Sequence, residues 1–81
     1  MKKYVYYAIF NESDEGIAVS FPDIFGGETC GDDFDDAVFM AKDLLRMMLT
    51  QAPGQCEEPL PKAEMEKLFP GKKIVAIEVE I

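Results

Sequence analysis

The sequence contains no histidine and no tryptophan, and only two serines and two cysteines among its 81 residues. Without histidine it lacks the side chain that most often acts as a general base or metal ligand near neutral pH. Ser13 and Ser20 stand in no catalytic pattern, and Cys30 and Cys56 form no Cys-x-x-Cys pair. We therefore expect a protein that is not an enzyme, with no cofactor or metal and with both thiols free.

Long apolar runs are also missing, because no stretch approaches the roughly 20 residues that span a bilayer. The apolar segment 4–10 follows two lysines but leads into a polar segment without a signal-peptide cleavage pattern, so we interpret it as a strand. These observations predict a cytoplasmic protein that does not enter the membrane. The length allows a single domain, residues 1–81, whose small core would gain from a partner or an oligomer.

Basic residues are scarce: eight lysines and arginines stand against sixteen acidic residues, which gives a net charge of -8. The only adjacent basic pairs are Lys2-Lys3 and Lys72-Lys73. Such a surface repels phosphate backbones, so we expect no direct binding of nucleic acid. A basic protein partner fits the charge better, although an acidic surface also serves solubility alone.

The segment 31–51 is the one stretch that is long and periodic enough to predict a helix directly. Asp33 and Asp36 resemble a capping box at its start, and Pro53-Gly54 marks its end. Apolar residues recur at helical spacing and predict one buried face. This face comprises Phe34, Ala37, Val38, Ala41, Leu44, Leu45 and Met48.

Four strands are predicted, at residues 2–10, 17–21, 28–30 and 72–81, with a short second helix at residues 62–69. The order β-β-β-α-α-β gives an α+β two-layer sandwich with sheet order 3-2-1-4 and the long helix on one face. We expect the first three strands to form a meander. A right-handed crossover through the helix would then place the fourth strand beside the first and parallel to it.

Two clusters invite a ligand but have simpler explanations. Asp32, Asp33, Asp35 and Asp36 offer oxygen ligands for a hard cation, yet the glycine-hinged loop and terminal glutamate of an EF-hand are missing, so helix capping explains them better. Gly26-Gly27 is not followed by Lys-Ser/Thr, so a phosphate-binding loop is not indicated.

The residues between 19 and 45 read Phe21-Pro22-Asp23-Ile24, then Gly26, Thr29 and Gly31-Asp32, and continue into Phe34-Asp35-Asp36-Ala37-Val38 and Ala41-Lys42-Asp43-Leu44-Leu45. This pattern resembles the HicB-like antitoxin family. Leu60-Pro61 and the segment 74–79 also match the family pattern, so the resemblance covers nearly the whole chain. Phe25, Gly27 and Glu28 depart from it, where the family has mostly proline, cysteine and an apolar residue.

The resemblance implies a partial RNase H-like fold without nuclease activity, and an antitoxin that binds and blocks a small basic HicA-like toxin that cleaves mRNA. Family members often carry a DNA-binding domain after the last strand. Residues 1–81 contain none, so we expect no autorepression by this chain. The alternative is a stand-alone protein-binding or regulatory module of the same fold with no toxin partner.

Two groups of residues are candidates for contact with a partner. Asp23, Ile24, Phe25 and Glu28 lie on a predicted glycine-hinged turn, which either carries recognition or only links two strands. Phe39, with Met40 and Met47 beside it, falls on the helix side opposite the predicted core and forms a candidate patch for an oligomer or a partner.

Strand 2–10 is apolar on both faces, so we expect a homodimer or a higher homo-oligomer. Either the edges of the predicted strands or the Phe39 patch would form its interface.

Overall fold

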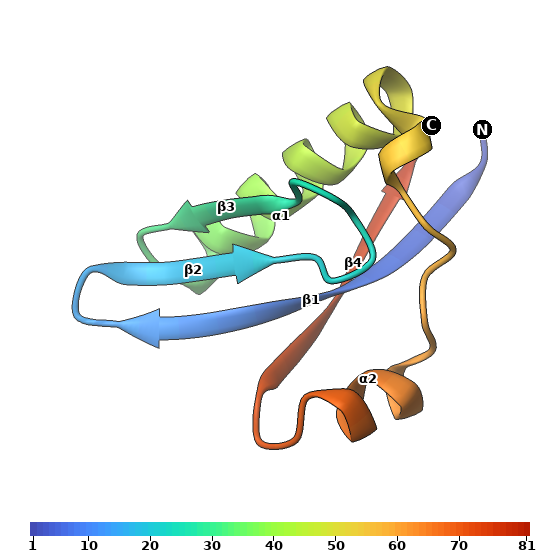
Figure 1. The fold of residues 1–81 in the computed structure, drawn as a ribbon. Coiled ribbons are helices and arrows are strands. Elements are labelled where there is room, and N and C mark those ends of the chain that lie inside the picture. Colours follow the sequence, from blue (N-terminus) through green and yellow to red (C-terminus); the bar gives the residue numbers. More distant parts are fainter.

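Four strands form one antiparallel sheet in the order β3-β2-β1-β4, and two α-helices accompany it (Figure 1). The structure is a computed structural model that describes all of residues 1–81. Its elements, in chain order, are β1 (Lys3–Ser13), β2 (Gly16–Ser20), β3 (Glu28–Gly31), α1 (Phe34–Gln51), a 3-10 turn (Pro53–Gln55), α2 (Lys62–Leu68) and β4 (Lys73–Glu80). The α+β class and the strand order 3-2-1-4 are thus confirmed.

The core lies between α1 and one face of the sheet. Alternate residues of β1, β2 and β4 point toward the helix, which follows from the two-residue period of a strand. The alternate residues of the predicted strand 17–21, Ile17, Val19 and Phe21, are all buried there. The helix contributes Ala37, Ala41, Leu45 and Met48; the strands and the following loop contribute Tyr6, Ala8, Phe10, Ile17, Val19, Phe21, Ile24, Ile77 and Val79.

Helix α1 begins and ends where the sequence predicts. The Asp33 carboxylate accepts a hydrogen bond from the Asp36 amide (2.8 Å), and the Asp36 carboxylate accepts one from the Asp32 amide (2.8 Å). One predicted core residue is misplaced, because Phe34 remains 42% exposed. As the first residue of α1 it packs only one side of its ring against Phe10 (ring centroids 5.6 Å apart), while Lys73 Nζ lies 4.8 Å from the ring centroid.

The predicted direction of the last strand is wrong, because β4 runs antiparallel to β1. Helix α1 starts next to the β1–β2 hairpin and ends near the opposite end of the sheet, so a strand that followed at once would be parallel to β1. Residues 52–72 instead carry the chain back along the sheet (Figure 1). Consequently β4 starts with Lys73 opposite Phe10 and ends with Glu80 opposite Lys3.

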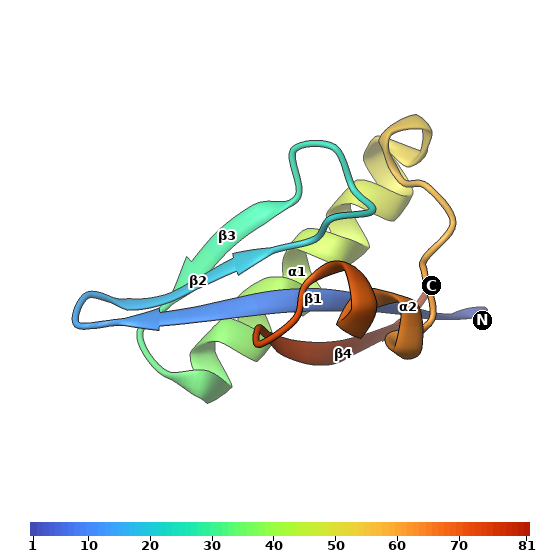
Figure 2. The same ribbon diagram turned by 60° about the horizontal axis from the view of Figure 1, so that its bottom comes forward.

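The return segment also covers part of the second face of the sheet. Figure 2 shows α1 behind the sheet and α2 in front of it. Met65 of α2 and Ile9 of β1 are buried but do not belong to the core under α1. The two-layer description therefore holds for most of the sheet, and α2 adds a small third layer. Neither helix is long and apolar enough to cross a membrane.

Candidate functional site

The loop between β2 and β3 is a closed, hydrogen-bonded turn. The Phe21 amide donates to the Gly27 carbonyl (2.8 Å), and the Gly27 amide donates to the Ile24 carbonyl (3.0 Å). Gly26 adopts a φ of 79°, a left-handed conformation that glycine reaches without steric cost. The glycine pair of the sequence thus folds the loop back on itself, as a bend at this position was predicted to do.

A second segment, the connector between α1 and α2 (residues 52–61), is bound to this loop. The amide of Phe25 donates to the Gln55 carbonyl (2.9 Å), and the amide of Glu57 donates to the Asp23 carbonyl (2.8 Å). Ile24 and Cys56 form an isolated antiparallel bridge. Residues 23–25 and 55–57 therefore lie side by side like two short strands, and the loop gains a rigid support.

Two side-chain hydrogen bonds complete the support. The Asp23 carboxylate accepts from the Leu60 amide (3.1 Å), and the Tyr6 hydroxyl donates to the Glu57 carbonyl (2.7 Å). Tyr6 belongs to β1, so the connector is bound both to the loop and to the central strand. The loop that carries the candidate residues is thus positioned by the connector, which is itself bound to β1.

The four predicted contact residues of this loop divide into two pairs. Phe25 is 78% exposed and Glu28 is exposed, so both side chains are free to meet a partner. Asp23 and Ile24 are buried, and their side chains do not project as the sequence suggested. The Asp23 carboxylate is hydrogen-bonded to the connector, and Ile24 belongs to the hydrophobic core. In this conformation the two side chains support the loop from inside and leave Phe25 and Glu28 as its exposed candidates.

Sequence reasoning missed two acidic residues of the connector. Glu57 and Glu58 are exposed and lie in the segment that pairs with the loop. They stand between the two predicted helices, and no local signal connects them with Phe25 across more than thirty positions. We call these exposed residues of the loop and of the connector paired with it, Phe25, Glu28, Glu57 and Glu58, together the Phe25 surface.

Burial perturbs two titratable groups beneath this surface. Burial, followed by the nearby Cys56 and Asp23, raises the pKa of Tyr6 above its ordinary value of 10.0. Burial also raises the pKa of the Cys56 thiol. Both groups are therefore protonated at neutral pH, and the Tyr6 hydroxyl retains the proton that it donates to Glu57.

The second predicted patch lies on α1. Phe39 is 65% exposed and Met47 is exposed, whereas Met40 is half-buried. The prediction that Phe39 points away from the core is confirmed. Its neighbours Asp43 and Arg46 are exposed as well, so this face of α1 is mixed in character rather than a continuous apolar surface.

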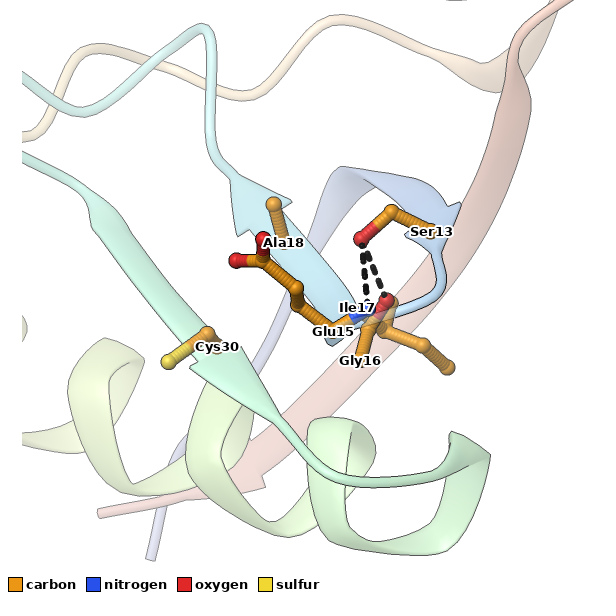
Figure 3. Close-up of a pocket in the computed structure, with 6 residues that line it drawn as sticks. All are labelled: Ser13, Glu15, Gly16, Ile17, Ala18 and Cys30. Atoms are coloured by element: carbon orange, nitrogen blue, oxygen red, sulfur yellow. Dashed lines mark hydrogen bonds between the residues drawn. The ribbon is translucent and has the colours of Figure 1, made fainter.

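One shallow pocket of about 210 Å³ lies at the hairpin end of the sheet (Figure 3). The Ser13 hydroxyl at its rim donates to the Gly16 carbonyl and accepts from the Glu15 amide, both at 3.3 Å. The hydroxyl thus stabilises the turn between β1 and β2. The volume is below the roughly 300 Å³ at which small-molecule sites begin, and we do not assign a ligand to it.

Neither a family model, nor a curated protein, nor a solved structure shows a significant match to the chain.

Proposed function

We propose that this protein is a HicB-like antitoxin that binds a small basic HicA-like toxin and blocks its cleavage of mRNA. The observation that carries the proposal is the Phe25 surface, where an aromatic side chain stands on a loop fixed by Asp23, Tyr6 and the connector. Rigid, exposed aromatic residues are frequent anchors of protein interfaces, because little conformational entropy is lost when they bind.

The charge of the molecule supports a basic partner. Glu28, Glu57 and Glu58 accompany Phe25, and the whole chain carries a net charge of -8. A toxin that cleaves RNA needs a cationic face to hold phosphate, and an acidic antitoxin would be steered to that face and would compete with RNA for it. The chain would thus act by covering a site rather than by chemistry of its own.

The fold proposal that accompanies this function is a partial RNase H-like domain. Its support is the three-stranded meander followed by a long helix, together with the resemblance of residues 19–45 to the family. The antiparallel β4 differs from the parallel strand that a direct crossover would give, so the likeness that we propose concerns β1, β2, β3 and α1.

Inhibition of RNA cleavage tests the proposed function. The purified chain is mixed at twofold excess with the product of the neighbouring gene, and cleavage of a labelled mRNA is followed. We expect cleavage to stop. Full cleavage, with both proteins folded, would leave the alternative of a binding module without a toxin. The association rate should also fall as salt rises from about 0.05 to 0.5 M, because the screening length shortens several-fold.

A pair of phenylalanine variants locates the contact. Phe25→Ala should weaken toxin binding by about 30-fold or more, as expected for a truncated interface anchor. Phe39→Ala is the matched control, because it removes an exposed phenylalanine from α1 on the same molecule. Loss of binding in the control, with none in Phe25→Ala, would move the interface to α1 and contradict the assignment of the Phe25 surface.

A further inference from the structure

Strand β4 ends the sheet with its outer edge unpaired. It is eight residues long, pairs with β1 on one side only, and has no strand on the other. The edge strand at the opposite side, β3, has only four residues. The first half of β1 is also unpaired on one side, because β2 pairs only with Ile9–Ser13. The connector is bound to this half of β1 through the hydrogen bond from the Tyr6 hydroxyl to the Glu57 carbonyl. The longest uncovered edge is therefore that of β4.

The register with β1 shows which backbone groups of β4 are free. Lys2 and Ile81 exchange two hydrogen bonds, of 2.7 and 2.9 Å, so they form a hydrogen-bonded pair at one end of the ladder. Such pairs alternate along an antiparallel ladder, so every second residue of β4 points its N–H and C=O away from β1. These residues are Ile74, Ala76, Glu78 and Glu80.

Most protections of an edge strand are missing from β4. Natural edges are kept from pairing by proline, by bulges, by charged side chains or by a covering element, and of these β4 has only the charges of Lys73, Glu78 and Glu80 near its ends. Residues 74–80 contain no proline and no lysine, and the register with β1 runs without a bulge from Lys73 to Glu80. The strand thus presents a continuous row of donors and acceptors to a second strand.

We propose that two copies of the chain pair antiparallel along β4, around a twofold axis at Ala76, into one eight-stranded sheet. In this register Ile74 lies opposite Glu78 of the second copy, and Lys72 lies opposite Glu80 of the second copy. By symmetry, this pair of opposite charges occurs twice, once on each side of the axis. The axis is perpendicular to the sheet, so the two α1 helices lie on the same face.

Neighbouring registers are less favourable. An axis at Glu78 would place two glutamates directly opposite each other, which destabilises a pair of strands. An axis at Ile77 would place Glu78 opposite Ala76 and leave Lys72 without a partner. An axis at Val75 or at Ile74 would bring Pro70 into the ladder and shorten it. The Ala76 register keeps residues 74–78 in the ladder and brings Lys72, which lies in the bend just before β4, opposite Glu80 of the second copy. It is independent of the proposed antitoxin role.

Charge exchange across the axis tests this register. Sedimentation equilibrium of the unaltered chain at tens of micromolar should give twice the monomer mass of 9.1 kDa. Lys72→Glu and Glu80→Lys should each weaken dimerisation by about tenfold, because each change creates two like-charge pairs by symmetry. The double variant should restore it. Lys42→Glu on α1 is the matched control for a change of charge and should leave the dimer intact.

A backbone variant tests the hydrogen bonds themselves. Ala76→Pro removes an N–H that points away from β1, so it blocks the second copy while the β1–β4 ladder keeps its bonds. It should yield a folded monomer, as checked by circular dichroism. Amide exchange of residues 74, 76, 78 and 80 should be protected only at concentrations where the dimer forms.

Three results would overturn the proposal. They are a monomeric mass for the unaltered chain, a double charge variant that stays as weak as the single ones, and a dimer that survives Ala76→Pro but is lost in Phe39→Glu. The last result would assign self-association to the patch on α1.

Discussion

Asp23 acts as a brace between two segments that are far apart in the chain. Its carbonyl accepts the Glu57 amide, and its carboxylate accepts the Leu60 amide. The residue is almost fully buried, so water does not replace these partners easily. The carboxylate that the sequence suggested as a contact for a partner instead fixes the position of Phe25.

Asp23→Ala should lower the free energy of unfolding by about 1–3 kcal/mol, because the partly buried Leu60 amide loses a charged acceptor. Urea unfolding measures the difference. Asp43→Ala serves as the control, since Asp43 is exposed on α1 and should change stability by less than about 0.5 kcal/mol. Equal losses in both variants would contradict the bracing role.

The Tyr6 hydroxyl should make stability depend on pH in the alkaline range. Its pKa is raised in the folded state above the ordinary 10.0, so the folded protein holds this proton more tightly than the unfolded chain. The resulting stabilisation is complete below about pH 10 and is lost as the pH rises toward the folded pKa. The half-buried Cys56 thiol, whose pKa is also raised by burial, contributes in the same direction from about pH 9.

Tyr6→Phe should cost about 1 kcal/mol at pH 7, because the Glu57 carbonyl loses its donor. The variant should also lose less stability than the unaltered chain when unfolding is repeated near pH 10.5, while the Cys56 contribution remains in both. Tyr7→Phe is the control, because the Tyr7 hydroxyl has no protein partner. A variant as sensitive to alkali as the parent would refute the assignment to Tyr6.

Among the elements, β3 and α1 meet at a point where only glycine fits. A Cβ atom on Gly31 would lie 2.5 Å from the Ala37 Cα atom, which belongs to the rigid first turns of the helix. Gly31→Ala should therefore force β3 and α1 apart and destabilise by about 1–3 kcal/mol.

Gly54→Ala is the matched substitution, because nothing lies within 4 Å of its added Cβ and its φ is not positive. It should be neutral or stabilising by up to about 1 kcal/mol, through a smaller entropy of the unfolded chain. Thermal unfolding compares the two. A similar loss of stability in both variants would show that the close approach at Gly31 does not affect the free energy of unfolding.

Local sequence patterns predicted the helices and strands well, but they did not predict the contacts between segments that are far apart in the chain. The cap at Asp33, the alternation of Ile17, Val19 and Phe21, and the boundaries of α2 follow from residues close in sequence. The direction of β4 depends on where residues 52–72 carry the chain, which no periodicity encodes. The pairing of the loop at Asp23 with the connector was not predicted for the same reason, because backbone hydrogen bonds do not require particular side chains.

At the scale of the whole molecule, charge repulsion is weakly compensated. The net charge is -8, and the three ion pairs, Lys3–Glu78, Lys67–Glu64 and Lys73–Glu12, are all solvent-exposed. Exposed pairs contribute only about 0–1 kcal/mol each. Salt should therefore weaken the repulsion among the acidic residues more than it weakens the attraction within the ion pairs.

We expect the free energy of unfolding to rise as sodium chloride increases from about 0.05 to 0.5 M. The rise should vanish near pH 4.3, the isoelectric point, where the net repulsion is absent. A decrease with salt at pH 7 would show that the ion pairs, or local pairs across a dimer, outweigh the net charge.

The two hydrogen bonds between Lys2 and Ile81 bring the ends of the chain together, and Figures 1 and 2 mark N and C at the same end of the molecule. A few linking residues would join them into a covalent ring without moving a strand. Opening that ring in the turn at Asp14 and Glu15 would give a circular permutant in which β4 and β1 are adjacent in sequence. Their long-range ladder would become a local hairpin, and so the topology, rather than the interactions, would set how fast this sheet assembles.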